Sequence, residues 1–124
     1  MEFWSFPANY DRSYMPDPQS DYWFPVRETM DAGERERAIV DRLQQVMSYA
    51  YASSNFYKNK WDAAGIHPEH IRSLEDFERV PVITKQELRV AQERSEPFGD
   101  YLCVPDSEVH HIHGTSGTTG FFAR

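Results

Sequence analysis

Cysteine is nearly absent from this sequence, because Cys103 is the single one among 124 residues. No disulfide can therefore form within the chain, and the composition fits a reducing compartment. Cys103 stands between Leu102 and Val104, an apolar context that indicates a small packing residue rather than a nucleophile. The sequence also lacks an early apolar run of signal-peptide type and any stretch of about 18 apolar residues. We therefore expect a cytoplasmic chain that does not span a membrane.

Basic residues are scarce relative to acidic ones, with 13 Lys and Arg against 20 Asp and Glu and a formal net charge of −7. Binding to nucleic acid or to an anionic membrane surface requires a basic patch, which this balance does not supply. We therefore exclude nucleic acid as a partner. The mixed charges of Glu34–Arg37 are typical of a solvated helix face and indicate no docking site.

Proline and aromatic residues are concentrated at the start of the chain, and prolines discourage any long helix there. We interpret residues 1–25 as an extended arm that lies across a helical surface through its aromatic side chains. The prolines are Pro7, Pro16, Pro18 and Pro25, and the aromatic side chains that would make this contact are Phe3, Trp4, Phe6, Tyr10, Tyr22, Trp23 and Phe24.

Two helices are predicted next, joined as a hairpin. Asp31 has the position of a helix cap with Glu34 three residues later, and this first helix should run to about Ser53. The second should begin near Asn55 and end at Gly65, because glycine suits the left-handed end of a helix. The apolar positions that repeat at helical spacing, and so should be buried, are Ile39, Leu43, Val46, Met47 and Ala50 in the first helix and Phe56 and Trp61 in the second.

Two further cap signals come after this hairpin. Ser73 and Asp76 open a short helical turn that Pro81 ends, and Thr84 with Glu87 forms a capping box that starts a helix to about Gln92. Lys85 falls in the first turn after that cap, where the pattern favours an exposed structural residue over a phosphate-binding lysine. The region from 26 to 107 is therefore predicted to be helical.

The segment His113–Gly120 reads HGTSGTTG and carries most of the functional information. Glycines let the backbone approach a ligand closely, and closely spaced hydroxyl groups suit the oxygens of a polyphosphate such as ATP. A flexible linker has a similar composition. Residues Glu108–His113 alternate as a strand entering a glycine loop would, which favours the phosphate-binding interpretation.

Two other interpretations of this end of the chain are weaker. The loop is not that of the common nucleotide triphosphatases, because Phe121 stands where their motif requires a lysine. The histidines His110, His111 and His113 could suggest zinc, but on a strand at most two of them share a face and no further ligand completes a set. We therefore assign no metal site.

The TSGTTG run resembles the phosphate-binding signature of adenylate-forming enzymes, and its surroundings resemble the amino-terminal region of the phenylacetate-CoA ligase family. The resemblance extends from about Asp21 to Gly120, roughly the first quarter of a family member. After Gly120 the chain departs from the usual proline and basic residue, with Phe121–Arg124 in their place. The segments that carry the resemblance are Tyr22–Trp23, Tyr49–Tyr51, Asn55–Tyr57, Ala64–Gly65, Ile71–Phe77, Val80–Pro81, Thr84–Leu88 and Pro97–Gly99.

The resemblance implies an ATP-dependent ligase that converts an aryl carboxylic acid to an acyl-adenylate and then to a CoA thioester. ATP, Mg²⁺ and coenzyme A are the implied cofactors of the complete enzyme, and this chain should not hold them tightly. It contains none of the implied catalytic residues, so we expect the isolated chain to be inactive. The nucleotide-binding residues carried over are Thr115, Ser116, Gly117, Thr118, Thr119 and Gly120.

The expected fold class is α+β, the mostly helical amino-terminal portion of the large α/β domain of such a ligase, with one or two strands near the carboxy-terminal end. Residues 108–124 would form a strand and a truncated loop, and the unpaired edge of that strand favours a homodimer. We expect an amino-terminal fragment of an aryl-acid CoA ligase, produced by truncation or a frameshift. The alternative is a stand-alone helical interaction module that performs no chemistry.

Overall fold

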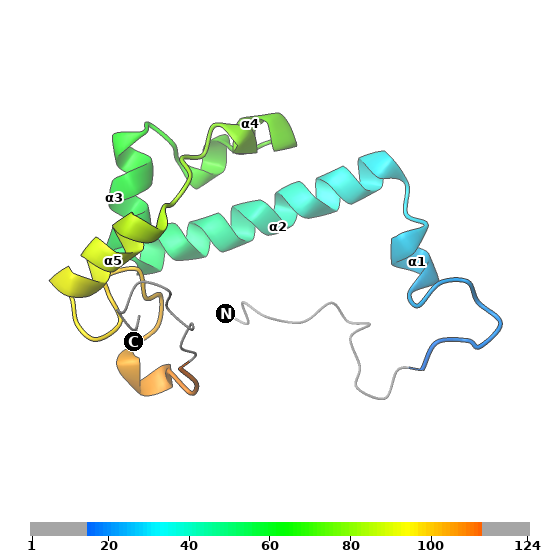
Figure 1. Ribbon diagram of the computed structural model, residues 1–124. Helices are drawn as coiled ribbons and strands as arrows, with labels where there is room; N and C mark the ends of the chain where they lie inside the picture. Colours follow the sequence, from blue (N-terminus) through cyan, green and yellow to red (C-terminus); the bar gives the residue numbers. More distant parts are fainter. Residues whose placement is uncertain (1–14, 113–124) are drawn as a thin grey trace.

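The computed structural model describes residues 15–112, and in this part of the chain the regular structure is helical (Figure 1). Five α-helices and two short 3-10 helices succeed one another along these residues. No helix among them is both long and apolar enough to cross a membrane. The elements are α1 Pro25–Glu28, α2 Ala32–Ser53, α3 Asn55–Ala63, η1 Pro68–His70, α4 Leu74–Glu78, α5 Lys85–Arg94 and η2 Asp106–Glu108.

Helix α2 is the longest element, and α3 and α5 lie at its carboxy-terminal end (Figure 1). Asp31 caps it as predicted, since its carboxylate accepts hydrogen bonds from the backbone N–H groups of Gly33 and Glu34 at 2.9 and 3.1 Å. Its amino-terminal half extends away from the rest, and α1 lies beyond that end. The arrangement leaves residues 32–39 exposed, and burial along α2 starts only at Val40.

The core lies where α2 turns into α3. Ser54 separates the two helices, and α3 ends at a turn in which Gly65 takes a φ of 67° and Ile66 donates a backbone hydrogen bond to Trp61. This turn brings the chain back over α2, so that η1 contacts that helix. The buried cluster is Met47, Ala50, Trp61, Ile66 and Ile71, with Tyr51, Tyr57, Val80 and Cys103 packed against it.

The predicted caps of the two later helices are confirmed. The Ser73 hydroxyl accepts from the Asp76 N–H at 3.1 Å at the start of α4. At the start of α5, Thr84 and Glu87 exchange hydrogen bonds in both directions, which makes a complete capping box. Both caps are formed between residues three apart, so the sequence alone specifies them.

The predicted burial on α2 is only partly confirmed. Met47 and Ala50 belong to the core, but Ile39 and Val46 remain 41% and 42% exposed. The apolar sector of α2 is wider than the surface that α3 and η1 cover, so one edge of it faces outward. In the amino-terminal arm, Tyr22 and Trp23 are also exposed, and the arm's residues 1–14 lie outside the described part.

The predicted strand near the carboxy-terminal end is not confirmed. Residues 109–112 adopt no strand, and His113 lies outside the described residues. A strand needs a partner for its backbone N–H and C=O groups, and the part of the chain that the structure describes contains no second strand. The homodimer expected through that strand edge therefore has no described strand to support it. The observed class over residues 15–112 is helical rather than α+β.

Candidate functional site

The six residues predicted to bind phosphate, Thr115 to Gly120, lie outside the described residues. The structure therefore gives no geometry for the loop itself. It does describe the segment that leads to the loop as far as Ile112, and it describes a hollow between α3 and α5 near the start of that segment.

Two hydrogen bonds fix the segment that leads to the predicted loop to the turn between α2 and α3. The Tyr49 hydroxyl donates to the Cys103 carbonyl at 2.8 Å, and the buried Ser54 hydroxyl donates to the Asp100 carbonyl at 2.9 Å. The Asp100 carbonyl also accepts from the Phe56 N–H at 3.3 Å. The chain therefore leaves the helical core at a defined place before it continues toward the predicted loop.

Cys103 has the environment of a packing residue, as its apolar neighbours predicted. Its side chain is partly buried against the core cluster, and burial raises the pKa of the thiol above its ordinary value. A raised pKa reduces the thiolate fraction near neutral pH, and the thiolate is the reactive form of cysteine. The site around Cys103 therefore does not favour nucleophilic chemistry.

The histidines before the predicted loop do not form a metal centre together with other described residues. No group of three or more histidine, cysteine or carboxylate side chains within residues 15–112 is arranged to hold a metal ion. Both His110 and His111 are exposed, after the short turn η2. His113 lies outside the described part, so its place relative to them stays untested.

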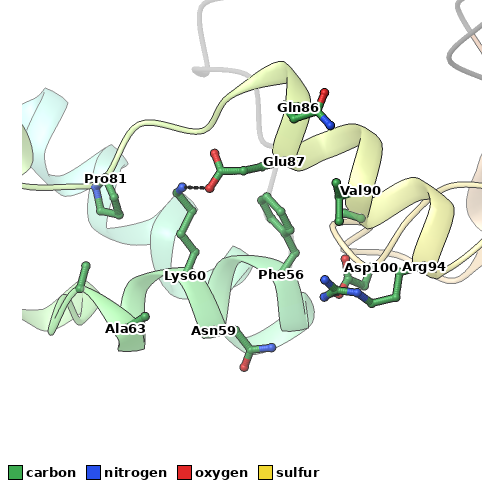
Figure 2. A pocket seen from close by; sticks show the side chains of 12 residues that line it. Phe56, Asn59, Lys60, Ala63, Pro81, Gln86, Glu87, Val90, Arg94 and Asp100 are labelled. Atoms are coloured by element: carbon green, nitrogen blue, oxygen red, sulfur yellow. Dashed lines mark hydrogen bonds and ion pairs between the residues drawn. The ribbon is translucent and has the colours of Figure 1, made fainter. Parts of the chain in front are cut away.

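A hollow of about 610 Å³ lies between α3 and α5 (Figure 2). Phe56 and Ala63 come from α3, Val90 comes from α5, and Pro81 closes one end. Figure 2 shows the Phe56 ring at the centre of the hollow, with Val90 on the facing helix. The exposed lining is predominantly apolar, and four charged side chains also contribute to it: Lys60, Glu87, Arg94 and Asp100.

The cations of the hollow are matched by carboxylates. Lys60 of α3 forms an ion pair with Glu87 of α5, and Figure 2 shows the two side chains facing each other across the space between the helices. Hydrogen bonds from Lys60 and from Thr84 hold the pKa of Glu87 at about 2, well below its ordinary value of 4.5. Arg94 lies 3.9 Å from the Asp100 carboxylate. The hollow therefore has no excess positive charge for an anion such as phosphate.

Sequence reasoning does not find this hollow. It identifies Glu87 as a capping residue, but the ion pair of Glu87 with Lys60 joins residues 27 apart on different helices. No local pattern indicates which two helices will face each other. Lys85, for which the pattern favours a structural role, is exposed and is not among the residues that line the hollow.

No protein-family model matches the chain. Curated proteins do match, and they share one name. The chain is 40% identical over 93 residues to a phenylacetate-coenzyme A ligase of Escherichia coli (strain K12), which covers 75% of this chain and 20% of that protein. It is 36% identical over 96 residues to a phenylacetate-coenzyme A ligase of Thermus thermophilus, covering 77% of this chain and 20% of that protein.

Solved structures of 2-hydroxyisobutyryl-CoA ligase match more of the chain. One of them, in complex with 2-HIB-AMP and CoA in the thioesterification state, is 57% identical with a TM-score of 0.83 over 98% of this chain and 26% of that chain. Another, in the postadenylation state with 2-HIB-AMP, is 56% identical with a TM-score of 0.81 over 94% of this chain and 25% of that chain. The chain thus spans a fifth to a quarter of the length of these relatives.

Proposed function

This chain belongs to the phenylacetate-coenzyme A ligase family of adenylate-forming acyl-CoA synthetases, and on that premise we propose that it supplies the phosphate-binding portion of an ATP-dependent acid–CoA ligase. The observation that carries the proposal is the likeness to 2-hydroxyisobutyryl-CoA ligase, which extends over nearly the whole chain at more than half identity. The cytoplasmic location expected from the composition is part of the same proposal. No observation on the described residues favours the alternative of a non-catalytic interaction module.

The proposed reaction has two steps. In the first, a carboxylate oxygen attacks the α-phosphorus of ATP, a bond forms between them, and pyrophosphate leaves. In the second, the thiolate of coenzyme A attacks the acyl carbonyl carbon, and AMP leaves as the thioester forms. The segment Thr115–Gly120 would hold the β- and γ-phosphates in the first step through hydroxyl and backbone N–H groups, so that the attack is in line.

Mg²⁺ would act as the counter-ion of the ATP phosphates in this proposal. Residues 15–112 offer no cluster of three or more ligands for it. In this proposal the chain contributes phosphate contacts through the loop. A hydroxyl hydrogen bond contributes about 0.5 to 1.5 kcal/mol, and one to a charged group about 1.5 to 3. Because association costs several kcal/mol, we expect the isolated chain to bind ATP no more tightly than about millimolar.

The acid is the finer part of the proposal. The family's name favours an aryl acid of the phenylacetate type. The higher identity to 2-hydroxyisobutyryl-CoA ligase, 57% against 40%, favours a small branched 2-hydroxy acid instead. We therefore propose 2-hydroxyisobutyrate or a close analogue as the substrate and phenylacetate as the acid to compare with it.

A chimeric ligase tests this function. The chain replaces the matched quarter of 2-hydroxyisobutyryl-CoA ligase, and acyl-CoA formation is measured with 2-hydroxyisobutyrate and with phenylacetate. We expect thioester formation with the hydroxy acid, and its loss when both Thr118 and Thr119 are replaced by alanine. A folded chimera that releases no pyrophosphate with either acid would contradict the proposal. For the isolated chain, micromolar ATP binding in a calorimetric titration would contradict the affinity argument.

A further inference from the structure

We propose that the hollow between α3 and α5 is a docking socket for the remainder of the ligase, into which an uncharged apolar side chain of that part inserts. This inference rests on the proposed function, because it requires the chain to work as one portion of a larger enzyme. It assigns a role to a surface outside the segment that is proposed to bind phosphate.

The shape of the hollow is that of a preformed apolar cavity. Phe56 and Ala63 line it from α3, Val90 and Ala91 line it from α5, and Pro81 closes one end. Val90 is 40% exposed, although it belongs to an amphipathic helix whose neighbouring Ala91 is only 2% exposed. An apolar concavity of this kind offers space and contact surface for an apolar side chain of a partner.

The walls of the hollow are held in place from both sides. The ion pair between Lys60 and Glu87 joins α3 to α5 at one end, and Glu87 is itself fixed by the capping box with Thr84. At the other end, the Asp100 carbonyl accepts hydrogen bonds from Ser54 and from the first turn of α3. A rigid socket loses little conformational entropy on docking, which favours binding.

The charged side chains of the hollow argue against a small anionic ligand. Lys60 is paired with Glu87, and Arg94 lies beside Asp100, so both cations have an acidic partner. The second carboxylate oxygen of Asp100 is buried without a hydrogen bond to any described residue and adds no positive charge. Apolar surface interspersed with such pairs matches the mixed composition of a protein–protein interface.

The length of the relatives and the course of the chain identify the occupant. The fold of these residues recurs at a TM-score of 0.83 within 2-hydroxyisobutyryl-CoA ligase, of which it makes up 26%. The larger remainder of such an enzyme must therefore pack against this portion. The chain also leaves the core beside the hollow, since Asp100 lines it and Cys103 is fixed to α2 shortly afterwards.

Site-directed labelling of a cysteine in the hollow tests the socket. Ala63 is exposed and lines the hollow, so Ala63→Cys should leave the fold intact and place a thiol in the socket. Its reaction with a maleimide is followed by peptide mass spectrometry in the isolated chain and in the chimeric ligase. We expect labelling at least about tenfold slower in the chimera, because the docked part must open before the thiol reacts.

Ala38→Cys is the matched control, since Ala38 is an exposed helical alanine on the free half of α2, away from the hollow. Its labelling rate should be the same in both proteins. If the Ala63→Cys chimera does not unfold cooperatively, Asn59→Cys, which lies one turn earlier on α3 and also lines the hollow, replaces it. Equal labelling of the socket cysteine in chain and chimera would overturn the proposal.

The labelling needs no substrate, so its result is separate from that of the activity assay. A chimera that protects the socket cysteine but forms no thioester would support docking and contradict the proposed function. A chimera that forms the thioester but leaves the socket cysteine unprotected would support the proposed function and contradict docking at the hollow. Protection that appears in the isolated chain and increases with its concentration would assign the hollow to a second copy and overturn the present proposal.

Discussion

Lys60 and Glu87 form the ion pair that joins α3 to α5. Glu87 uses its other carboxylate oxygen to accept hydrogen bonds from the Thr84 N–H and hydroxyl, at 2.7 and 2.9 Å. One side chain therefore caps its own helix and binds a neighbouring helix at the same time. The local structure at the start of α5 and the packing of α5 against α3 thus depend on the ionised form of a single residue.

Replacing Glu87 by glutamine should destabilise the chain in a pH-dependent way. The folded-state pKa of Glu87 is about 2, against an ordinary value of 4.5, so its ionised form is favoured in the folded state. Its stabilisation is then fully present above about pH 4.5 and is lost as the pH falls through about 2. We expect Glu87→Gln to lower the melting temperature at pH 7, and the difference from the parent chain to shrink as the pH falls from 4.5 to 2.

The melting-temperature difference is the informative quantity, because Asp62 and Asp76 also have lowered pKa values and titrate in both proteins. Glu93→Gln, at an exposed position on the same helix, serves as the control and should not reproduce the effect. A difference that stays constant from pH 7 to pH 2 would contradict the assignment.

The adjacent serines at the end of α2 should respond differently to alanine. Ser54 is only 3% exposed, and its hydroxyl donates to the Asp100 carbonyl, whereas Ser53 is exposed. Ser54→Ala should therefore cost about 0.5 to 1.5 kcal/mol of unfolding free energy, the net value of a hydrogen bond. Ser53→Ala should have little effect or stabilise slightly, because alanine favours the helix. Urea titrations followed by circular dichroism compare the two, and equal effects would rule out the role given to Ser54.

Two glycines with positive φ should also differ. Gly65, at φ 67°, has open space where a Cβ would lie. In Gly65→Ala the new Cβ meets no neighbour among the described residues, so the cost is that of the left-handed backbone conformation alone, about 1 to 2 kcal/mol of unfolding free energy. Gly99, at φ 82°, would place its Cβ 2.5 Å from the Tyr101 ring and 3.2 Å from the Gln92 backbone nitrogen. Gly99→Ala should therefore be the more destabilising of the two in thermal unfolding, and the reverse order would contradict this geometry.

The core should be sensitive to the loss of one methylene at Ile71. Its side chain is 1% exposed and belongs to the buried cluster, so Ile71→Val should cost about 0.5 to 1.5 kcal/mol. Ile112 is 64% exposed, and the same substitution there should change stability by less than the error of a denaturant titration. Similar losses at both positions would show that Ile71 is not part of a packed core.

The features predicted correctly from the sequence are the local ones. Asp31, Ser73 and Thr84 cap helices because a short polar side chain reaches backbone N–H groups two or three residues ahead. Gly65 ends the α3 turn because only a residue without a Cβ takes that backbone conformation at no steric cost. Each of these depends on residues close together in the chain.

The features that sequence analysis missed depend on which surfaces meet. The apolar spacing on α2 indicates a helix, but it does not show that Ile39 and Val46 face outward. The hollow could not be predicted either. Its two helices are joined by the ion pair of Lys60 with Glu87, and no local pattern indicates that these two residues will meet. The phosphate-binding loop, predicted from composition and resemblance, remains a prediction because it lies beyond Ile112.

The hydrogen bond from Tyr49 to the Cys103 carbonyl bears on the order of folding. The hairpin of α2 and α3 is built from neighbouring segments, whereas this bond and the one from Ser54 to Asp100 join residues 54 and 46 positions apart. Contacts between distant positions form after local ones, because the entropy of closing a long loop must first be overcome. We therefore expect the segment that carries the predicted nucleotide loop to be positioned late in folding, on a helical hairpin that forms first.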